Sequence, residues 1–93
     1  YQPIFNMPGI ARVGVDTAGS VVVGNLAPTV LIEGSPVVVV GASIAGHGRG
    51  PHSSPVMVGG SGTVFANGIP ICRAGDPASC GHTVTGSSTV SCG

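Results

Sequence analysis

Two stretches of the sequence, TVLIEGSPVVVVGA at Thr29–Ala42 and TVFANGIPICRAGD at Thr63–Asp76, align with each other without a gap. They share an opening Thr-Val pair, a glycine two residues before a proline, and a second glycine near the end. Val and Ile, which favour strands, supply most of their apolar residues. Repetition of this kind indicates one supersecondary unit that is used more than once.

Two partial copies of the unit lie near the beginning and the end of the chain. The segment GSSTV at 86–90 matches GSGTV at 60–64, and PGIARVG at 8–14 resembles PICRAG within 70–75. Three similar units in 93 residues predict pseudo-threefold packing, in which the apolar faces of three hairpins close around a common axis. Linear stacking of the units is the alternative that the repeats leave open.

Each unit has the pattern of a β-hairpin. A short strand begins at Thr-Val, and the dipeptides Glu33-Gly34 and Asn67-Gly68 then supply turns, because Gly and Asn tolerate a positive φ. A second short strand comes next, at Val37–Val40 or Ile71–Arg73, and no long stretch has a helical period. The sequence therefore predicts an all-β fold of short strands and hairpins.

Composition limits both the core and the partners of the chain. With 17 Gly, 8 Pro, no Trp, one Tyr and two Phe, large side chains are scarce, and chains this short commonly need a metal, disulfides or a partner to supplement the core. Charged residues make up 6% and the formal net charge is zero. These values argue against nucleic-acid binding through phosphates and against a polybasic membrane surface. No apolar run is long enough for stable membrane insertion.

The low charge also lowers the barrier to association, which predicts a surface that is partly covered by a partner. The alternative is a small domain that associates nonspecifically because it has few charges, with no dedicated partner. Residues 1–6 look unlike the rest of the chain, and Met7 makes a natural start. We therefore expect a leader at 1–6, either carried over from cloning or disordered, and a single domain at 7–93. No signal peptide is visible, because no basic segment precedes an apolar one.

All three histidines lie in two loops that come directly after repeat strands. His47 and His52 form an H-x4-H pair in one loop, and Cys80 and His82 form a C-x-H pair in the other. Together they supply four N and S ligands, the number that a tetrahedral structural zinc site needs. One ion would then join two repeats, and its binding energy would contribute to folding. The spacing alone leaves open that these are polar side chains of solvated loops.

The remaining residues do not form a recognisable catalytic pattern. Cys72 lies between apolar residues and is interpreted as a small buried hydrophobe, while Cys92 is assigned no role. Four protein ligands would close the metal shell, whereas a catalytic zinc keeps one position open. If Cys80 were not bound, a three-histidine site would remain, so hydrolysis stays an alternative. The chain also lacks the lysine of a phosphate-binding loop.

The segments MPGIARVG at Met7–Gly14 and GSGTVFANGIPICRAGD at Gly60–Asp76, together with Cys-x-His at 80–82, resemble the PAAR-repeat family. The resemblance covers essentially residues 7–93. Four departures from the family pattern stand in the sequence. The two central alanines of the motif are replaced at Pro70–Arg73, and the arginine is lost at Pro36–Val39. Asp16 lies one residue later than Asp76 relative to its glycine, and the loop at Asp16–Ser20 contains no histidine.

The resemblance implies a small conical all-β domain with zinc near its apex. Carried over to this sequence, it implies that one structural Zn²⁺ is bound by His47, His52, Cys80 and His82. It further implies a non-enzymatic tip, one chain per trimer, that sharpens and caps the trimeric VgrG β-helical spike of a bacterial type VI secretion system. Such a tip aids envelope puncture and effector delivery. The alternatives are a small zinc-dependent hydrolase or toxin, and a generic zinc-stabilised interaction module.

The same resemblance sets expectations for partners and location. The spike protein is the expected partner, effector proteins are further candidates, and no nucleic acid is expected. The protein is expected in the bacterial cytoplasm before the system fires. On firing, the spike is expected to deliver it outside the cell or into a target cell.

Overall fold

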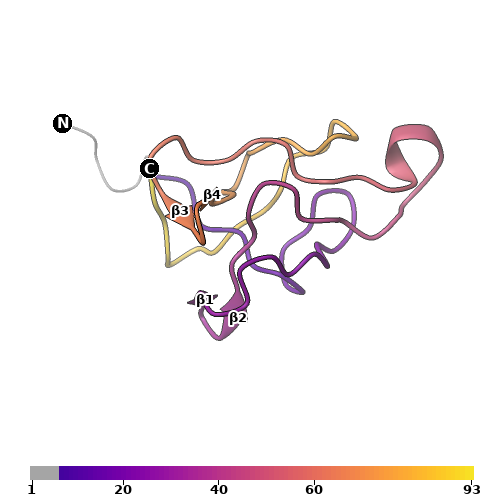
Figure 1. Ribbon diagram of the computed structural model, residues 1–93. Coiled ribbons are helices and arrows are strands. Elements are labelled where there is room, and N and C mark those ends of the chain that lie inside the picture. Colours follow the sequence, from indigo (N-terminus) through magenta and orange to yellow (C-terminus); the bar gives the residue numbers. More distant parts are fainter. Residues whose placement is uncertain (1–6) are drawn as a thin grey trace.

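Two short antiparallel hairpins form around the two predicted turns (Figure 1). Their second strands begin two residues earlier than the predicted Val37–Val40 and Ile71–Arg73, because Val37 and Val39 pair instead with Arg12 and Ile71 of the neighbouring units. The computed structural model describes residues 7–93, so the leader expected at 1–6 lies outside the described residues. Strand β1 (Leu31–Ile32) pairs with β2 (Ser35–Pro36), and β3 (Phe65–Ala66) pairs with β4 (Ile69–Pro70). Both central residues of each two-residue turn have positive φ, the geometry of a type I′ turn.

The third hairpin is assembled from the two partial repeats at the ends of the sequence. Ser91 forms an antiparallel bridge with Gly9, as the first residue of β1 does with the second residue of β2. The backbone N–H of Cys92 donates to the Pro8 carbonyl at 3.1 Å, an ordinary length for a ladder bond. The opening fragment and the closing fragment of the sequence therefore complete one unit together.

The three units close into a ring around a common axis. The N–H of Ala11 donates to the carbonyl of Cys72 at 3.0 Å, that of Cys72 to Val38 at 2.8 Å, and that of Val38 to Ala11 at 3.0 Å. All three residues are fully buried. Three equivalent residues joined by a cycle of three backbone hydrogen bonds define a pseudo-threefold axis. This confirms the predicted all-β, pseudo-threefold arrangement and excludes linear stacking of these units.

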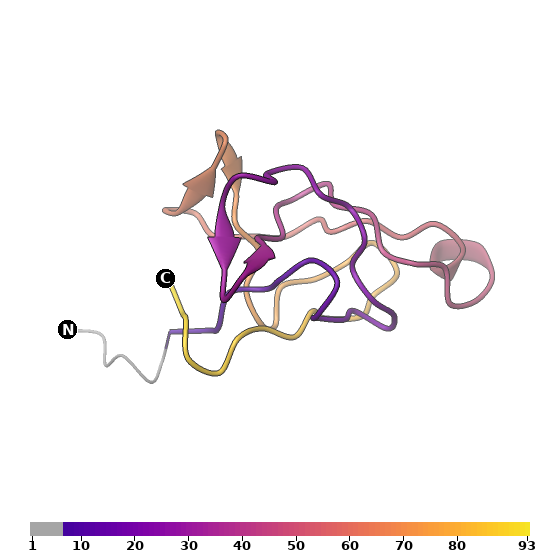
Figure 2. The same cartoon turned by 90° about the horizontal axis from the view of Figure 1, so that it is seen from below.

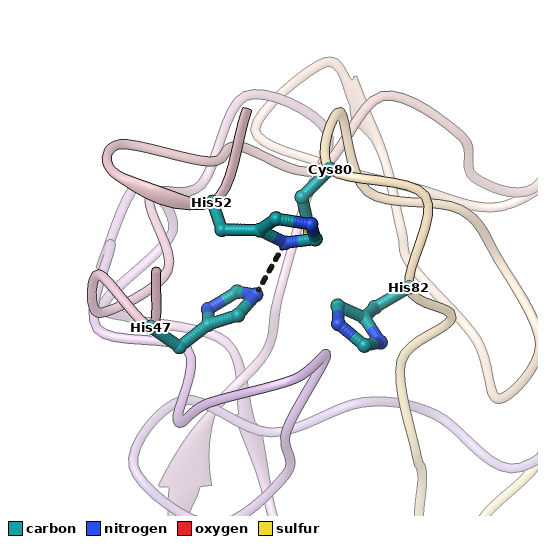
Figure 3. A group of neighbouring side chains, drawn as sticks. All are labelled: His47, His52, Cys80 and His82. Atoms are coloured by element: carbon teal, nitrogen blue, oxygen red, sulfur yellow. Dashed lines mark hydrogen bonds between the residues drawn. The ribbon is translucent and has the colours of Figure 1, made fainter. Parts of the chain in front are cut away.

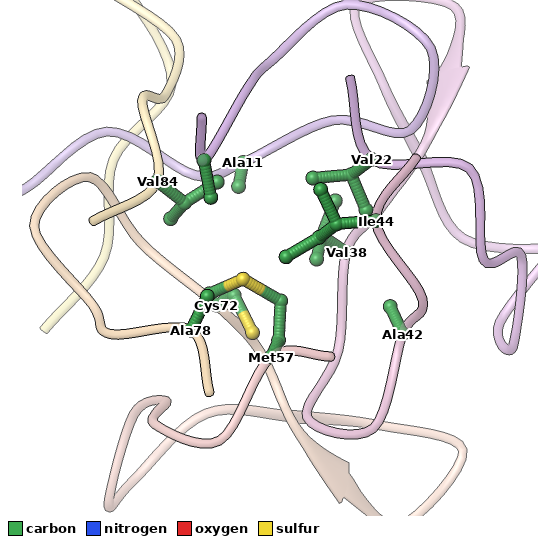
Figure 4. Packing of buried hydrophobic residues seen from close by; sticks show 10 residues of the cluster. Ala11, Val22, Val38, Ala42, Ile44, Met57, Cys72, Ala78 and Val84 are labelled. Atoms are coloured by element: carbon green, nitrogen blue, oxygen red, sulfur yellow. The ribbon is translucent and has the colours of Figure 1, made fainter. Parts of the chain in front are cut away.

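Two layers of apolar side chains lie on opposite sides of the ring, because successive strand residues point to opposite faces. The inner cluster (Figure 4) consists of Ala11, Ala18, Val22, Val38, Ala42, Ile44, Met57, Cys72, Ala78 and Val84. The hairpin cluster consists of Ile10, Ala27, Val37, Val39, Ala66 and Ile71. The sulfur-bearing side chain of Cys80 packs against the inner cluster, so this layer lies on the side of the histidine loops.

The hairpins and the histidine loops lie at opposite ends of the molecule. Figures 1 and 2 show the described chain narrowing from the hairpins toward a single 3₁₀ turn, Gly50–His52. Among residues 7–93, no helix has the length and apolar character needed to span a bilayer. The 3₁₀ turn at the narrow end contains no buried residue.

Two of the three units carry an equivalent ion pair beside the ring. The carboxylate of Asp16 accepts hydrogen bonds from Nε, Nη2 and the backbone N–H of Arg12, and Asp76 accepts the same three from Arg73. In the remaining unit the aligned positions are Val39 and Ala42, both fully buried. The arginine missing from that repeat is thus matched by a missing aspartate, and apolar contact replaces the pair.

Replacing Asp16 with alanine tests this pair. Asp16 is buried, and it accepts a fourth hydrogen bond from the hydroxyl of Thr85 at 2.9 Å. Alanine removes all four hydrogen bonds to this buried carboxylate, so we expect Asp16→Ala to lower the free energy of unfolding by about 2–3 kcal/mol. Urea denaturation measures the change, with exposed Arg49→Ala as the control expected to change it by less than about 0.5 kcal/mol. Equal small changes in both variants would contradict this assignment.

The same pair predicts a pH dependence. Burial alone would raise the pKa of Asp16, but hydrogen bonds from Arg12 and Thr85 outweigh it and leave that pKa below its ordinary value of 3.8. A carboxyl with a lowered folded-state pKa contributes stability that is fully present above the unfolded pKa and is lost as pH falls through the folded one. Urea denaturation of the wild type and of Asp16→Ala should therefore converge below pH 3.8.

Candidate metal centre

The first histidine loop is closed tightly enough to place both of its imidazoles on one side. The backbone N–H of His47 donates to the carbonyl of His52 at 2.8 Å, which joins the two ends of the loop. Gly50, with φ of 60°, begins the 3₁₀ turn, and Pro51 is the next residue. Proline suits the first turn of a helix because its fixed φ is helical and its missing N–H is not needed there. The loop sequence therefore determines the separation of His47 and His52.

The second loop uses a glycine in the same way. The N–H of Ala78 donates to the carbonyl of His82 at 2.8 Å, and the N–H of Gly81 donates back to Ala78 at 3.0 Å. Gly81 has φ of 92°, a conformation that residues with a Cβ rarely adopt. Cys80 and His82 thus flank a tight turn. A bridge between Met57 and Ala78 connects this loop to the chain that leaves the first loop.

The structure brings all four of the predicted side chains together (Figure 3). The centroids of the His47 and His52 rings lie 5.0 Å apart, those of His47 and His82 5.0 Å, and those of His52 and His82 5.3 Å. One ligand atom from each imidazole and the Sγ of Cys80 all lie within 4.8 Å of one another. Tetrahedral zinc with bonds of about 2.0–2.3 Å separates its ligand atoms by roughly 3.3–3.8 Å. A small contraction therefore lets this group hold a metal ion.

One histidine of the group is oriented by the backbone. Nδ1 of His47 lies 3.1 Å from the carbonyl oxygen of Ala45, so a proton on Nδ1 donates to that oxygen and leaves the lone pair on Nε2. That Nε2 lies 3.1 Å from Nδ1 of His52, a spacing suited to two ligands of one ion. Metal-binding histidines commonly use their second nitrogen in this way.

A glycine in the remaining loop completes the walls of the site. A Cβ on Gly19 would lie 2.5 Å from Nε2 of His47 and 2.6 Å from Cδ2 of His82, so this residue packs directly against two imidazoles. Its φ is 84°. Sequence reasoning did not assign Gly19 any role, because its loop contains no histidine. Gly19 could have been identified from the equivalence of the three loops around the axis, since its loop is the counterpart of the two histidine loops.

The other two cysteines lie outside the group of four among residues 7–93. Burial raises the pKa of the Cys72 thiol to about 12, and its Sγ donates to the carbonyl of Gly59 at 3.3 Å. This agrees with the interpretation of Cys72 as a small buried hydrophobe. Cys92 is partly buried against the hairpin cluster.

The carboxylates are engaged elsewhere. Asp16 and Asp76 pair with arginines beside the ring, and Glu33 bonds Arg12, Ser87 and Thr89. None of the three belongs to the group of four. A hydrolytic metal centre commonly uses a carboxylate as general base beside its ion. Within residues 7–93, the side chains around the imidazoles do not provide one.

Comparison with known protein families gives one match that covers most of the chain. The family model for the PAAR motif matches residues 13–86, which is most of the chain. The chain therefore belongs to the PAAR motif family. No curated protein matches the sequence. The matched segment includes all four residues of the candidate metal centre.

Proposed function

We propose that this chain is a non-enzymatic structural tip that caps and sharpens the trimeric VgrG spike of a bacterial type VI secretion system. The observation that carries the proposal is the closed ring of hydrogen bonds, with three equivalent hairpins at one end and the four-residue group at the other. Membership of the PAAR motif family supports it, because this family is associated with spike tips.

The narrow end holds one structural Zn²⁺ in this proposal, with His47, His52, Cys80 and His82 as its ligands. A thiolate combined with imidazoles suits zinc. Four protein ligands fill a tetrahedral shell, so no position remains for a reactive water. The ion joins loops that contain too little apolar surface to hold each other.

The wide end binds the spike. A face with three equivalent hairpins is complementary to a partner with true threefold symmetry, which fixes one chain per trimer. Leu31 and Phe65, the first residues of β1 and β3, are 57% and 53% exposed at equivalent positions. Ser91 takes the equivalent position in the third hairpin. Exposed apolar side chains in two of the three hairpins favour burial of this face against another protein.

The structural role is favoured over a hydrolytic one by the closed ligand set and by the engagement of the carboxylates in other contacts. In this proposal the protein resides in the bacterial cytoplasm until the system fires, and the spike then carries it out of the cell or into a target. Effector proteins are further partners of such a tip.

Co-expression with the trimeric β-helical spike protein of the same cell tests the proposal. Native mass spectrometry of the purified complex is expected to show one chain per trimer. Leu31→Asp combined with Phe65→Asp should weaken the complex at least about tenfold, since two apolar anchors of roughly 1–2 kcal/mol each are replaced by charges. Val58→Asp, at a side chain that is also 53% exposed but lies outside the hairpins, is the matched control. Absence of a complex, or three chains per trimer, would sink the proposal.

A further inference from the structure

The loop at 16–20 carries no candidate ligand, yet it forms one wall of the candidate metal centre. A Cβ on Gly19 would lie 2.5 Å from Nε2 of His47 and 2.6 Å from Cδ2 of His82, so the backbone of this loop touches two imidazoles. Gly19 is itself exposed, so it lies between these rings and solvent. All four candidate ligands come from the other two loops. An ion would join those two loops and leave this one to be held by protein contacts alone.

The middle and the second half of this loop are held by apolar packing and by the backbone. Ala18 is fully buried and belongs to the inner cluster. The N–H of Ala45 donates to the carbonyl of Val21 at 2.9 Å, and Val22 forms an antiparallel bridge with Ile44. These contacts fix the part of the chain that leaves the loop.

A threonine hydroxyl holds the first half of the loop. Oγ1 of Thr85 accepts the backbone N–H of Thr17 at 3.1 Å and donates to Oδ1 of Asp16 at 2.9 Å. A hydroxyl can donate and accept at the same time, so one side chain binds two consecutive residues. These residues lie two and three positions before Gly19. The hydroxyl of Thr85 therefore connects the loop to the strand segment beside it.

Asp16 is a firm attachment point because its carboxylate is itself held. It accepts from Nε, Nη2 and the backbone N–H of Arg12 at 2.7, 3.1 and 2.8 Å. Hydrogen bonds between charged groups are stronger than those between neutral ones. Arg12 follows Ala11, one of the three residues of the hydrogen-bonded ring. Thr85 thus fixes the loop to the most regular part of the fold.

Thr85 has valine counterparts in the other two units. The backbone N–H groups of Val23 and Val58 donate to the carbonyls of the chain beside them, as that of Thr85 does to the carbonyl of Thr17. The two valines are 52% and 53% exposed. Valine has the shape of threonine but no hydroxyl. Among these three equivalent positions, the hydroxyl therefore occurs only beside the loop that has no ligand.

We propose that Thr85 is a positioning residue for the metal centre. Its hydroxyl holds Asp16 and Thr17, so that Gly19 stays packed against the imidazoles and limits the access of solvent to them. The role rests on the metal centre of the proposed function. A chelator has to reach the ion from solvent, so a loop that is held in place slows the release of the ion.

Release of zinc into an excess of a chromophoric chelator tests this role. Thr85→Val keeps the shape of the side chain and removes both hydroxyl contacts. We expect zinc release about fivefold faster than in the wild type, the factor that the loss of one ordinary hydrogen bond gives. Thr85→Ser keeps the hydroxyl and should release zinc at a rate within about twofold of the wild type.

Thr89→Val is the matched control. The hydroxyl of Thr89 also donates to a carboxylate, Oε2 of Glu33 at 2.6 Å, but it lies at the hairpin end, away from the loop. This variant should lose stability as Thr85→Val does, and its zinc release should stay within about twofold of the wild type. Equal rates for Thr85→Val and the wild type, or the same acceleration in both valine variants, would overturn the positioning role.

Amide hydrogen exchange separates this role from the metal centre itself. The N–H of Ala18 donates to the carbonyl of Ser20 at 2.9 Å, and the N–H of Val22 donates to that of Asp16 at 3.1 Å. In the protein as purified, both amides should exchange at least about threefold faster in Thr85→Val than in Thr89→Val, because the loop opens more often. Unchanged exchange would refute the hold by Thr85 and leave the metal centre intact. Wild-type protein that binds no zinc would refute the metal centre, and the positioning role with it.

Discussion

Chelation of the metal proposed for the narrow end is expected to lower the melting temperature of the purified protein by about 15 °C or more. The proposed ligands are His47, His52, Cys80 and His82, which come from two loops with few buried apolar residues. Metal binding in such a site is linked to folding, because the ligands are brought together only in the folded chain. Differential scanning calorimetry with and without EDTA measures the shift, and refilling with zinc should reverse it.

Substitution of single cysteines sharpens the same test. Cys80→Ser removes a proposed ligand, whereas Cys92→Ser changes a free thiol that is also partly buried but lies outside the group of four. We expect Cys80→Ser to lose most of its metal, measured by elemental analysis of the dialysed protein, and to melt close to the chelated wild type. Cys92→Ser should retain one ion per chain. Metal retained by Cys80→Ser, or wild-type protein purified without metal, would contradict the proposed site.

The turns of the two hairpins were predictable from local sequence, whereas the second strands, expected at Val37–Val40 and Ile71–Arg73, lie at Ser35–Pro36 and Ile69–Pro70. The turns at Glu33-Gly34 and Asn67-Gly68 depend on residues that tolerate positive φ, and the structure has φ of 55° and 53° at their first positions. Pro36 and Pro70 are each the last residue of a strand in a two-stranded sheet, where both strands are edges and a residue without an N–H is tolerated. Information of this kind lies within a few residues, so one sequence is enough to reveal it.

The third hairpin was not predictable in the same way. Sequence reasoning found its halves at 8–14 and 86–90 as separate fragments, and linear stacking remained open. The bridge between Gly9 and Ser91 joins residues at opposite ends of the chain, and no local signal specifies such a pairing. The ring through Ala11, Val38 and Cys72 is likewise visible only when the chain has closed.

The grouping of the four candidate ligands was predictable because histidine and cysteine carry their chemistry in the side chain. Four such residues in two glycine-rich loops suggested one site, and the structure brings all four together. Gly19 was missed for the opposite reason. Its contribution is the absence of a side chain at a place where two imidazoles approach the backbone, and that place exists only in three dimensions.

Gly19→Ala is therefore expected to damage the metal centre although it removes no ligand. The added methyl group would lie 2.5 Å from Nε2 of His47 and 2.6 Å from Cδ2 of His82, closer than real Cβ contacts. The two rings must move apart, and the separation that a single ion requires is then lost. We expect zinc affinity to fall at least about tenfold, measured by competition with a chromophoric chelator, since positioning losses of about 1.4 kcal/mol already give that factor.

Gly14→Ala separates this clash from backbone strain. Gly14 has φ of 80° and Gly19 has 84°, so alanine is strained to a similar extent at both, by about 1–2 kcal/mol. A Cβ at Gly14 meets no atom within 4 Å, however. Both variants should lose some stability, but only Gly19→Ala should lose metal affinity, because only its methyl group reaches the imidazoles. If the two variants bind zinc equally well, then close approach of the third loop is not what positions the histidines.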